Sequence, residues 1–369
     1  MATDCTRLRD LQEGSGAPRR LTLRRIAAVL LALAALPDTV VRDSSPQWDH
    51  RRALAVARIA APPAAATDLG PFRLRGVWQL VSSDIQFGGY SALLPRAGGR
   101  LLAISDRGTW LEFAEPIAAK ATSSGPIESH DHAMGHLLRD RREWTSIGDA
   151  EAATTDGDPG KTGGHIWISW EDRHAVSRFD TAPEAGWWHE RRGFPTAMKN
   201  WSPQFGAESM VRLPDGRFII VSEDFALRSY ERRHRTLLFP GDPTAPKVAD
   251  PAIGELTADA GYRPTDIVRL PDGRVLVLLR RLVWPLPLRF SCRIAIADPQ
   301  QLFRTGRWTA RTLARRDAPL PTDNFEGLTV RPRADGQLDV WVIADNNRAA
   351  TQRTLLLKLE LDPQDLPAR

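Results

Sequence analysis

Cysteine is scarce in this sequence, which contains only Cys5 and Cys292 among its 369 residues. Two cysteines cannot supply the framework of several disulfide bonds that stabilises small secreted domains. Cys292 lies in the apolar run Ser291–Ala297, where we expect a small buried hydrophobic residue. Cys5 lies in a segment that we expect to be removed or to lie outside the fold. The cysteines therefore do not indicate the redox compartment of the protein.

Hydrophobic runs long enough to cross a membrane are also missing. The run Ile26–Leu36 has eleven apolar residues, whereas a bilayer requires about 20. It follows the basic patch Arg19–Arg25, an order typical of a secretory signal peptide, and the paired arginines also permit a twin-arginine signal. We predict that residues 1–41 are a signal peptide that directs the protein to the periplasm or the medium. The alternatives are an uncleaved anchor that leaves the protein on the membrane facing the periplasm, and a cytoplasmic helix.

A strong excess of either charge is absent as well. Lys and Arg together number 50 against 45 Asp and Glu, a formal net charge of +5. The Arg-Arg pairs are scattered along the chain and do not form one basic segment, so we predict no nucleic-acid partner. Residues 42–70, rich in Ala, Pro and Arg, are predicted to be a linker.

What the sequence does contain is one repeated pattern: an apolar, β-branched run, a turn and a second such run, with acids at both outer ends. In the last copy, Asp323–Val330 is followed by the turn Ala334–Gly336 and by Val340–Asn346. Asp-Gly between two such runs favours a β-hairpin. We therefore assign a turn role, without chemistry, to the aspartates of three such turns, Asp215, Asp272 and Asp335.

The pattern occurs five times at a nearly constant period. One position, held in turn by Ser91, Glu151, Glu208, Thr265 and Glu326, recurs at steps of 60, 57, 57 and 61 residues. Such a period indicates a repeat architecture, and hairpins within each repeat indicate the blades of an all-β propeller, which need about 40–50 residues each.

Two further strands are predicted at the ends of the repeat region, Phe72–Val81 and Arg353–Leu361. Their pairing in a split blade would close the ring and remove its open edges. We therefore predict a six-bladed β-propeller over residues 71–369, closed by the N-terminal and C-terminal strands, and expect it to be a monomer.

Hairpin geometry predicts an acidic face. The first strand of each hairpin starts at the same face to which the second strand returns, so residues at these two positions should lie side by side. The second strands end at Asp106-Arg107, Glu171-Asp172, Glu223-Asp224, Arg280-Arg281 and Asp345-Asn346. If the first strands line the channel, carboxylates crowd its mouth, raise each other's pKa and favour a hard divalent cation, with calcium preferred over magnesium.

Five ordered motifs resemble the bacterial family named for an esterase-like activity of phytase. They are Gly89–Leu93 with Ile104–Gly108, Ala150–Ala152 with Trp167–Glu171, Gly206–Ser209, Arg263–Asp266 with Leu270–Gly273, and Asn324–Leu328 with Ile343–Asn347. The resemblance implies a propeller related in outline to calcium-dependent phytases and usually exported. Carried over to this chain, the motif acids that it implies as metal ligands are Asp106, Glu151, Glu171, Glu208, Glu223, Asp266, Glu326 and Asp345.

These observations predict an exported, metal-assisted hydrolase of small phosphoesters or carboxyl esters. The predicted catalytic residues are Glu208, Glu326, Arg107 and Arg280, and the predicted substrate-binding residues are Arg107, Arg281 and Asn346. Arginine suits the second role because its guanidinium binds phosphate or carboxylate in bidentate fashion. Ser91 is not predicted as a nucleophile, because no Gly-x-Ser-x-Gly turn surrounds it. Two alternatives stay open: acids that only accept backbone N–H groups of the next blade, and a non-enzymatic periplasmic propeller that binds a protein or glycan.

Overall fold

The computed structural model describes most of the predicted repeat region. The described residues are 54–60, 69–84, 86–116, 127–129, 131–137, 149–156, 164–180, 188–193, 195–199, 201, 206–225, 232–247, 249–283, 289–316, 322–349 and 351–369. The predicted signal peptide, residues 1–41, lies outside them. None of the helices in the described part is both long and apolar enough to span a bilayer.

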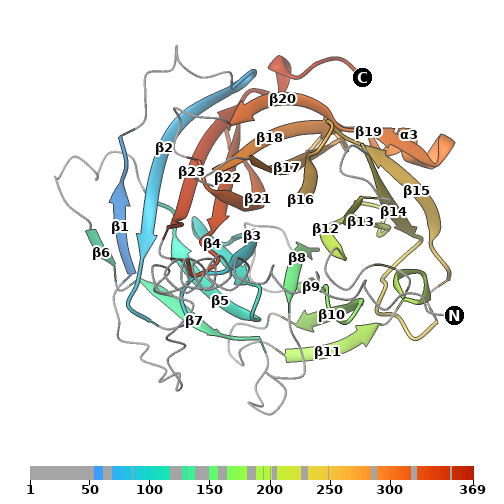
Figure 1. Cartoon of the computed structure of the whole chain (residues 1–369), viewed down its shortest axis with the longest axis horizontal. Helices are drawn as coiled ribbons and strands as arrows, with labels where there is room; N and C mark the ends of the chain where they lie inside the picture. The colour runs from blue at the N-terminus through green and yellow to red at the C-terminus, as the bar shows by residue number, and fades with distance from the viewer. Residues whose placement is uncertain are drawn as a thin grey trace, which may run out of the picture. The chain divides into compact units, whose positions relative to one another are not determined.

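Five β-sheets stand around a common centre, and the first strand of each predicted hairpin is the innermost strand of its sheet (Figure 1). From the inside outward, one sheet contains β3 (Tyr90–Arg96), β4 (Arg100–Ser105), β5 (Thr109–Ala114) and β7 (His132–His136). The next contains β8 (Ala150–Thr155), β9 (His165–Trp170), β10 (Ala175–Asp180) and β11 (Trp188–Gly193). The third contains β12 (Ala207–Arg212), β13 (Phe218–Phe225), β14 (Arg233–Phe239), β15 (Ala252–Thr257) and β19 (Arg307–Thr309). The fourth contains β16 (Arg263–Arg269), β17 (Val275–Val283), β18 (Arg289–Ala297) and β20 (Arg311–Arg316).

The fifth sheet corrects the predicted number of blades. It contains β21 (Asn324–Pro332), β22 (Leu338–Asp345), β23 (Thr354–Leu361), β2 (Phe72–Val81), β1 (Leu54–Arg58) and β6 (Ile127–Ser129). The two terminal strands do pair, from Phe72 opposite Leu361 to Leu80 opposite Thr354, but β23 also pairs with β22. They therefore complete the blade of the last hairpin and form no sixth one. Only one strand follows that hairpin in the sequence, so the N-terminal strands supply the outer part of its sheet.

The predicted linker also needs correction at Leu54–Arg58. This segment is strand β1, which pairs antiparallel with β2 and with β6. Leu54 is buried, the next three residues are half-buried and Arg58 is exposed, so this short apolar run packs at the outer part of the sheet. The surrounding Ala, Pro and Arg composition concealed this short pattern.

The hydrophobic core is divided among the interfaces between neighbouring blades. Five clusters of buried residues are found in the described part of the chain, and each one joins two adjacent sheets. Between the first and last blades, for example, Trp78 and Trp341 lie with ring centroids 5.7 Å apart in the cluster that also contains Tyr90. Burial of such large side chains at every interface holds the five inner strands at fixed positions around the centre.

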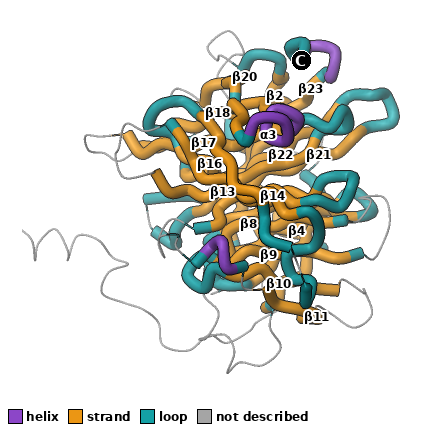
Figure 2. Tube along the Cα trace, turned by 90° about the vertical axis from the view of Figure 1, so that its right-hand side faces the viewer, coloured by secondary structure: helices purple, strands orange, loops and turns teal. Residues whose placement is uncertain are grey.

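The three Asp-Gly sequences form the predicted hairpin turns. Asp215, Asp272 and Asp335 accept hydrogen bonds from the backbone N–H two residues later, at 3.1, 2.9 and 3.1 Å. The glycine after each of them has a positive φ, between 82° and 87°, which few other residues adopt readily. Helix α3 (Pro299–Thr305) lies at the outer edge of the ring in Figure 1, and in the side view of Figure 2 it lies in front of the strands. Two 3₁₀ turns span Thr196–Met198 and Pro363–Asp365. The turn assignment of the three aspartates is confirmed.

Strand β1 and the preceding segment should contribute differently to stability. We expect deletion of residues 1–41 to leave the melting temperature of the protein unchanged, because no described strand lies there. Leu54→Ala should lower the free energy of unfolding by about 2–5 kcal/mol, as for other buried leucines. Thermal and urea denaturation followed by circular dichroism would measure both. An unfolded deletion variant, or an unchanged Leu54→Ala protein, would contradict this account of the N-terminal region.

Candidate functional site

Each of the five equivalent positions is part of a β-bulge near the start of an inner strand. The pairing register between inner and second strand shifts by one residue across Ser91, Glu208, Thr265 and Glu326, and across the pair Glu151-Ala152. A bulge inserts an extra residue and redirects its side chain, which is why bulges are frequent beside active sites. The repeated position found in the sequence is thus a repeated local distortion, and three of its five occupants are glutamates.

The second strands bring further acids to the same end of the channel. Asp106 and Glu171 directly follow strands β4 and β9, and Glu223 lies near the end of β13. The N–H groups of these three residues donate to the carbonyl oxygens of Gly89, Asp149 and Gly206 at 2.7, 2.8 and 3.1 Å. Asp345 pairs directly with Asn324 in the register of the last blade. The predicted side-by-side arrangement of strand starts and strand ends is therefore present in the structure.

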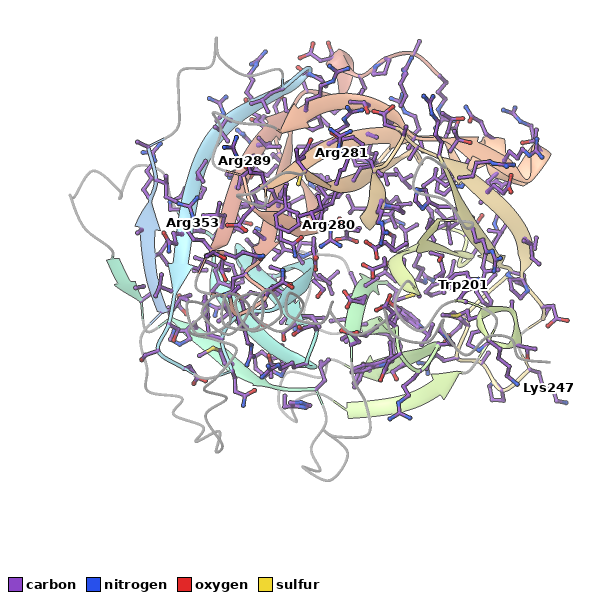
Figure 3. The ribbon with its side chains drawn as sticks, viewed as in Figure 1. Trp201, Lys247, Arg280, Arg281, Arg289 and Arg353 are labelled. Atoms are coloured by element: carbon purple, nitrogen blue, oxygen red, sulfur yellow. The ribbon has the colours of Figure 1, made fainter. Side chains whose placement is uncertain are left out.

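Arg280 lies in the fourth blade, which has an acid neither at the bulge nor at the end of its second strand. It lies toward the centre of the ring, whereas Lys247 lies at its periphery (Figure 3). The Arg280 Nη1 atom donates to Glu326 Oε1, and its Nη2 atom donates to Glu223 Oε1 at 3.0 Å. Arg263 reaches the other oxygen of Glu223 at 3.2 Å. Two guanidiniums thus offset part of the negative charge on this side of the site.

On the other side, three carboxylates come together, and none of them forms an ion pair with an arginine of the described segments. One oxygen each of Asp149, Glu151 and Glu171 lies within 4.8 Å of the others. Glu171 is fixed by the N–H of Gly206, which donates to its Oε1 atom at 2.5 Å. A Cβ atom at Gly206 would lie 2.7 Å from Cγ of Glu171, so glycine is required for this approach. Oxygen-only ligand sets of this kind suit calcium or magnesium.

Burial and the charges of neighbouring carboxylates disfavour the ionised forms of the glutamates at this site. Burial raises the pKa of Glu151 and of Glu208 well above the ordinary value, and neighbouring carboxylates, led by Glu208 for the former and by Glu223 for the latter, add to the effect. Burial likewise raises the pKa of Glu171 to about 7. The pKa of Asp345 is raised well above its usual range by burial and then by the charges of Glu326 and Asp106.

Asp106 and Asn346 connect the first and last blades at this face. Ser105 Oγ donates to Asp106 Oδ1 at 3.0 Å, and a Cβ at Gly89, where φ is +73°, would lie 2.4 Å from that oxygen. The side-chain oxygen of Asn346 accepts hydrogen bonds from the N–H groups of Gly89 and Arg348 at 3.1 and 3.0 Å. Asn346, predicted as a substrate-binding residue, thus has its carboxamide oxygen occupied in holding two loops together.

Asp266 does not lie with the other predicted metal ligands. It is buried, and its two oxygens accept hydrogen bonds from the N–H groups of Ile267 and Leu328 at 2.7 and 2.6 Å. Leu328 belongs to the neighbouring inner strand β21, so Asp266 joins two blades through the backbone. Thr265, not Asp266, occupies the bulge of this blade. The contacts of Asp266 are those of the alternative given above, an acid that accepts backbone N–H groups of the next blade.

The predicted arginines differ in their surroundings. Arg280 is engaged with Glu223 and Glu326, as described above. Arg281 is exposed, and its guanidinium carbon lies 4.6 Å from the centre of the Tyr262 ring. Arg107 is exposed beside Asp106, and among the described residues it forms no ion pair shorter than 4 Å, which leaves its guanidinium available at the rim.

Sequence reasoning missed a second repeated position, two residues before each bulge. Its occupants are Gly89, Asp149, Gly206, Arg263 and Asn324. Each of them contacts the acid cluster or leaves room for it; Asn324, for example, donates through Nδ2 to Glu326 Oε1 at 2.7 Å. Extension of the five-copy alignment by two residues toward the N-terminus would have identified them.

The family comparison agrees with the sequence resemblance. Residues 85–348, which include all five bulges, match the family described as phytase-like, esterase-like activity of phytase. Comparison with curated proteins gives no match.

Solved structures with similar coordinates are only distantly similar in sequence. An α-L-arabinofuranosidase from Podospora anserina in complex with cellotriose is 10% identical, with a TM-score of 0.44, over 84% of this chain and 98% of its own. An α-L-arabinanase from Cellvibrio cellulosa complexed with arabinohexaose is 12% identical, with a TM-score of 0.44, over 76% and 95%. A hypothetical protein from Leishmania major is 12% identical, with a TM-score of 0.39, over 75% and 86%. At these scores the similarity carries no argument about activity.

The raised pKa values predict a loss of stability with rising pH in metal-free buffer. Acids that bind protons more tightly when folded than when unfolded stabilise the fold at low pH and lose this effect as pH rises through their folded pKa. We therefore expect the free energy of unfolding, measured by urea denaturation with a chelator, to fall as the pH rises from about 6.5 through about 7, the folded pKa of Glu171. This window also avoids His234, whose pKa burial lowers to about 4 and which would act in the opposite direction at lower pH.

Glu208→Gln should make this decline shallower, because it removes one of the acids with a raised pKa. Glu255→Gln, on the outer strand β15, is the matched control and should decline as the wild type does. Equal slopes for all three proteins would show that the carboxylates do not repel one another in the folded state.

Proposed function

The chain belongs to the phytase-like family described by its esterase-like activity, and from this premise we propose that it is a metal-assisted hydrolase of phosphoesters or carboxyl esters. The observation that supports this most directly is the convergence of Asp149, Glu151 and Glu171 within 4.8 Å of one another, beside Glu208 and an ion-paired arginine. Clusters of buried acids with raised pKa values are characteristic of functional sites.

The residues at this end of the channel fit a hard divalent cation, and we propose calcium. Asp149, Glu151 and Glu171 would hold it, because they supply oxygen donors at close range and their mutual repulsion is unrelieved by an arginine. A bound cation of this kind would polarise an ester or phosphoryl oxygen and lower the pKa of water. Glu223 and Glu326, by contrast, are already paired with Arg280.

The protein's own side chains have separate tasks in this proposal. Arg280 holds Glu223 and Glu326 in place through one hydrogen bond to each, so it positions the acidic wall of the site. Glu208 lies between the two groups: Glu223 and Glu171 both raise its pKa, and Arg280 lowers it. This placement makes Glu208 the side chain best situated to accept a proton from attacking water, as general bases do.

We propose that the substrate carries an anionic group, which Arg107 binds at the rim. Arg107 is exposed beside Asp106, an acid whose pKa is raised by burial, an effect that the positive charges of Arg348 and Arg107 partly offset. One guanidinium can donate two parallel hydrogen bonds to two oxygens of a phosphate or carboxylate, which would orient a phosphoester toward the acids. A monomeric enzyme exported through the N-terminal segment is part of the same proposal, since secretion would bring it to extracytoplasmic phosphoesters.

Hydrolysis of p-nitrophenyl phosphate and p-nitrophenyl acetate would test the proposal directly. We expect turnover by chelator-treated protein only after calcium, magnesium or manganese is added. Glu171→Gln should lower kcat/KM by about 100-fold or more, in the range for loss of a group that acts on the reacting water or its metal. The amide keeps an oxygen for the N–H of Gly206, so the fold should be retained.

Asp335→Asn is the matched control, because this acid lies in a hairpin turn and should leave kcat/KM within about twofold. No turnover with any of these metals, across phosphoesters, lactones and carboxyl esters, would rule out the proposed activity. Binding of a protein or glycan at this face without turnover would then favour the non-enzymatic alternative.

A further inference from the structure

The opposite end of the central channel contains a cavity that the acidic site does not use. Its volume is about 280 Å³, and residues of all five inner strands line it, a few positions beyond the bulges. Most of the lining is apolar, with Leu94, Ala153, Leu270 and Val330 among its residues. Ligand pockets typically enclose about 300–1,000 Å³, so the size suits a small molecule.

Two arginines line this cavity from adjacent inner strands. Arg212 ends strand β12 and Arg269 ends strand β16. Within the described part of the chain, neither side chain forms an ion pair with an acid closer than 4 Å. Both side chains line the same cavity from neighbouring inner strands, and the positive charge of Arg212 contributes, after burial, to a lowered pKa of Arg269. Arg212 is half-buried and Arg269 is exposed, so both guanidiniums are accessible to an anion from solution.

Two other arginines at this end of the channel, in contrast, form ion pairs with glutamates. Arg96, at the end of β3, lies 3.5 Å from Glu112, and Arg331 in β21 pairs with Glu115. Arg331 also donates to the backbone carbonyl of Arg96 at 3.0 Å. Neutral ion pairs therefore close the side formed by β3 and β21, whereas the side formed by β12 and β16 remains positive.

We propose that this cavity binds a small organic oxyanion, with its phosphate or carboxylate head held by Arg212 and Arg269 and its apolar part in the channel. Guanidinium pairs are well suited to such heads, and the apolar lining would favour a ligand with a hydrocarbon portion over inorganic phosphate. The site is separate from the acidic face, so it does not depend on the proposed hydrolase activity or on a metal.

Calorimetric titration of the whole protein with hexyl phosphate would test this inference, with inorganic phosphate and hexanol as comparison ligands. We expect hexyl phosphate to bind at least about tenfold more tightly than either comparison ligand, since each lacks one of the two recognised parts. Arg212→Ala and Arg269→Ala should each weaken binding by about tenfold, the loss of one charged hydrogen-bonding group. Arg304→Ala, an exposed arginine on α3, should leave it unchanged, as should a chelator and Glu171→Gln.

Thermal melting of each variant would confirm that it is folded before its affinity is compared. Equal affinity of wild type, Arg212→Ala and Arg269→Ala for hexyl phosphate would overturn the proposal, as would inorganic phosphate binding as tightly as hexyl phosphate. Absence of measurable hexyl phosphate binding to the wild-type protein would overturn it too, whatever the outcome of the hydrolysis assays.

Discussion

Repulsion among partly buried carboxylates is the interaction on which this structure depends. Three bulges place Glu151, Glu208 and Glu326 at one end of a narrow channel, where burial already disfavours their charges. The blade with Thr265 at the bulge instead supplies Arg280, which neutralises part of the set. The remaining charge requires protons or a cation, because like charges in such a site cannot all ionise without a large cost. This excess of negative charge is the basis on which we propose a divalent-cation site.

The fold makes this crowding possible because its core does not depend on the channel. Five hydrophobic clusters lie between neighbouring blades and hold the inner strands at fixed positions. The cluster between the first and last blades, for example, packs Trp78 and Trp341 of the last blade with Tyr90 of the first. The side chain of Asp266 accepts a hydrogen bond from the backbone N–H of Leu328 and so joins one inner strand to the next. The apolar interfaces therefore stabilise an arrangement in which acids from distant parts of the sequence meet.

Periodicity made most of the fold and much of the site predictable. The 57–61-residue spacing located every inner strand, and hairpin geometry placed Glu171 beside Glu151. Two features of the structure depend on tertiary contacts, and the periodicity of the sequence did not reveal them. The sequence did not show that the last hairpin needs the two terminal strands to complete its own sheet. They were therefore counted as a separate sixth blade, which made the predicted blade number wrong. The direction of a side chain beside a bulge depends on the register, so the alignment that placed Thr265 at the repeated position did not show that the carboxylate of Asp266 accepts backbone N–H groups instead of joining the other acids.

Calcium titration by calorimetry tests the central claim most directly, since it measures whether the gathered acids form a cation site at all. Wild-type protein freed of metal should bind calcium saturably, with one strong site that includes Glu151 and Glu171. Glu151→Gln should lose most of this binding, whereas Asp266→Asn, if it remains folded, should retain it because that acid bonds only to backbone. No saturable binding by the wild-type protein, or equal binding by wild type and Glu151→Gln, would contradict the account.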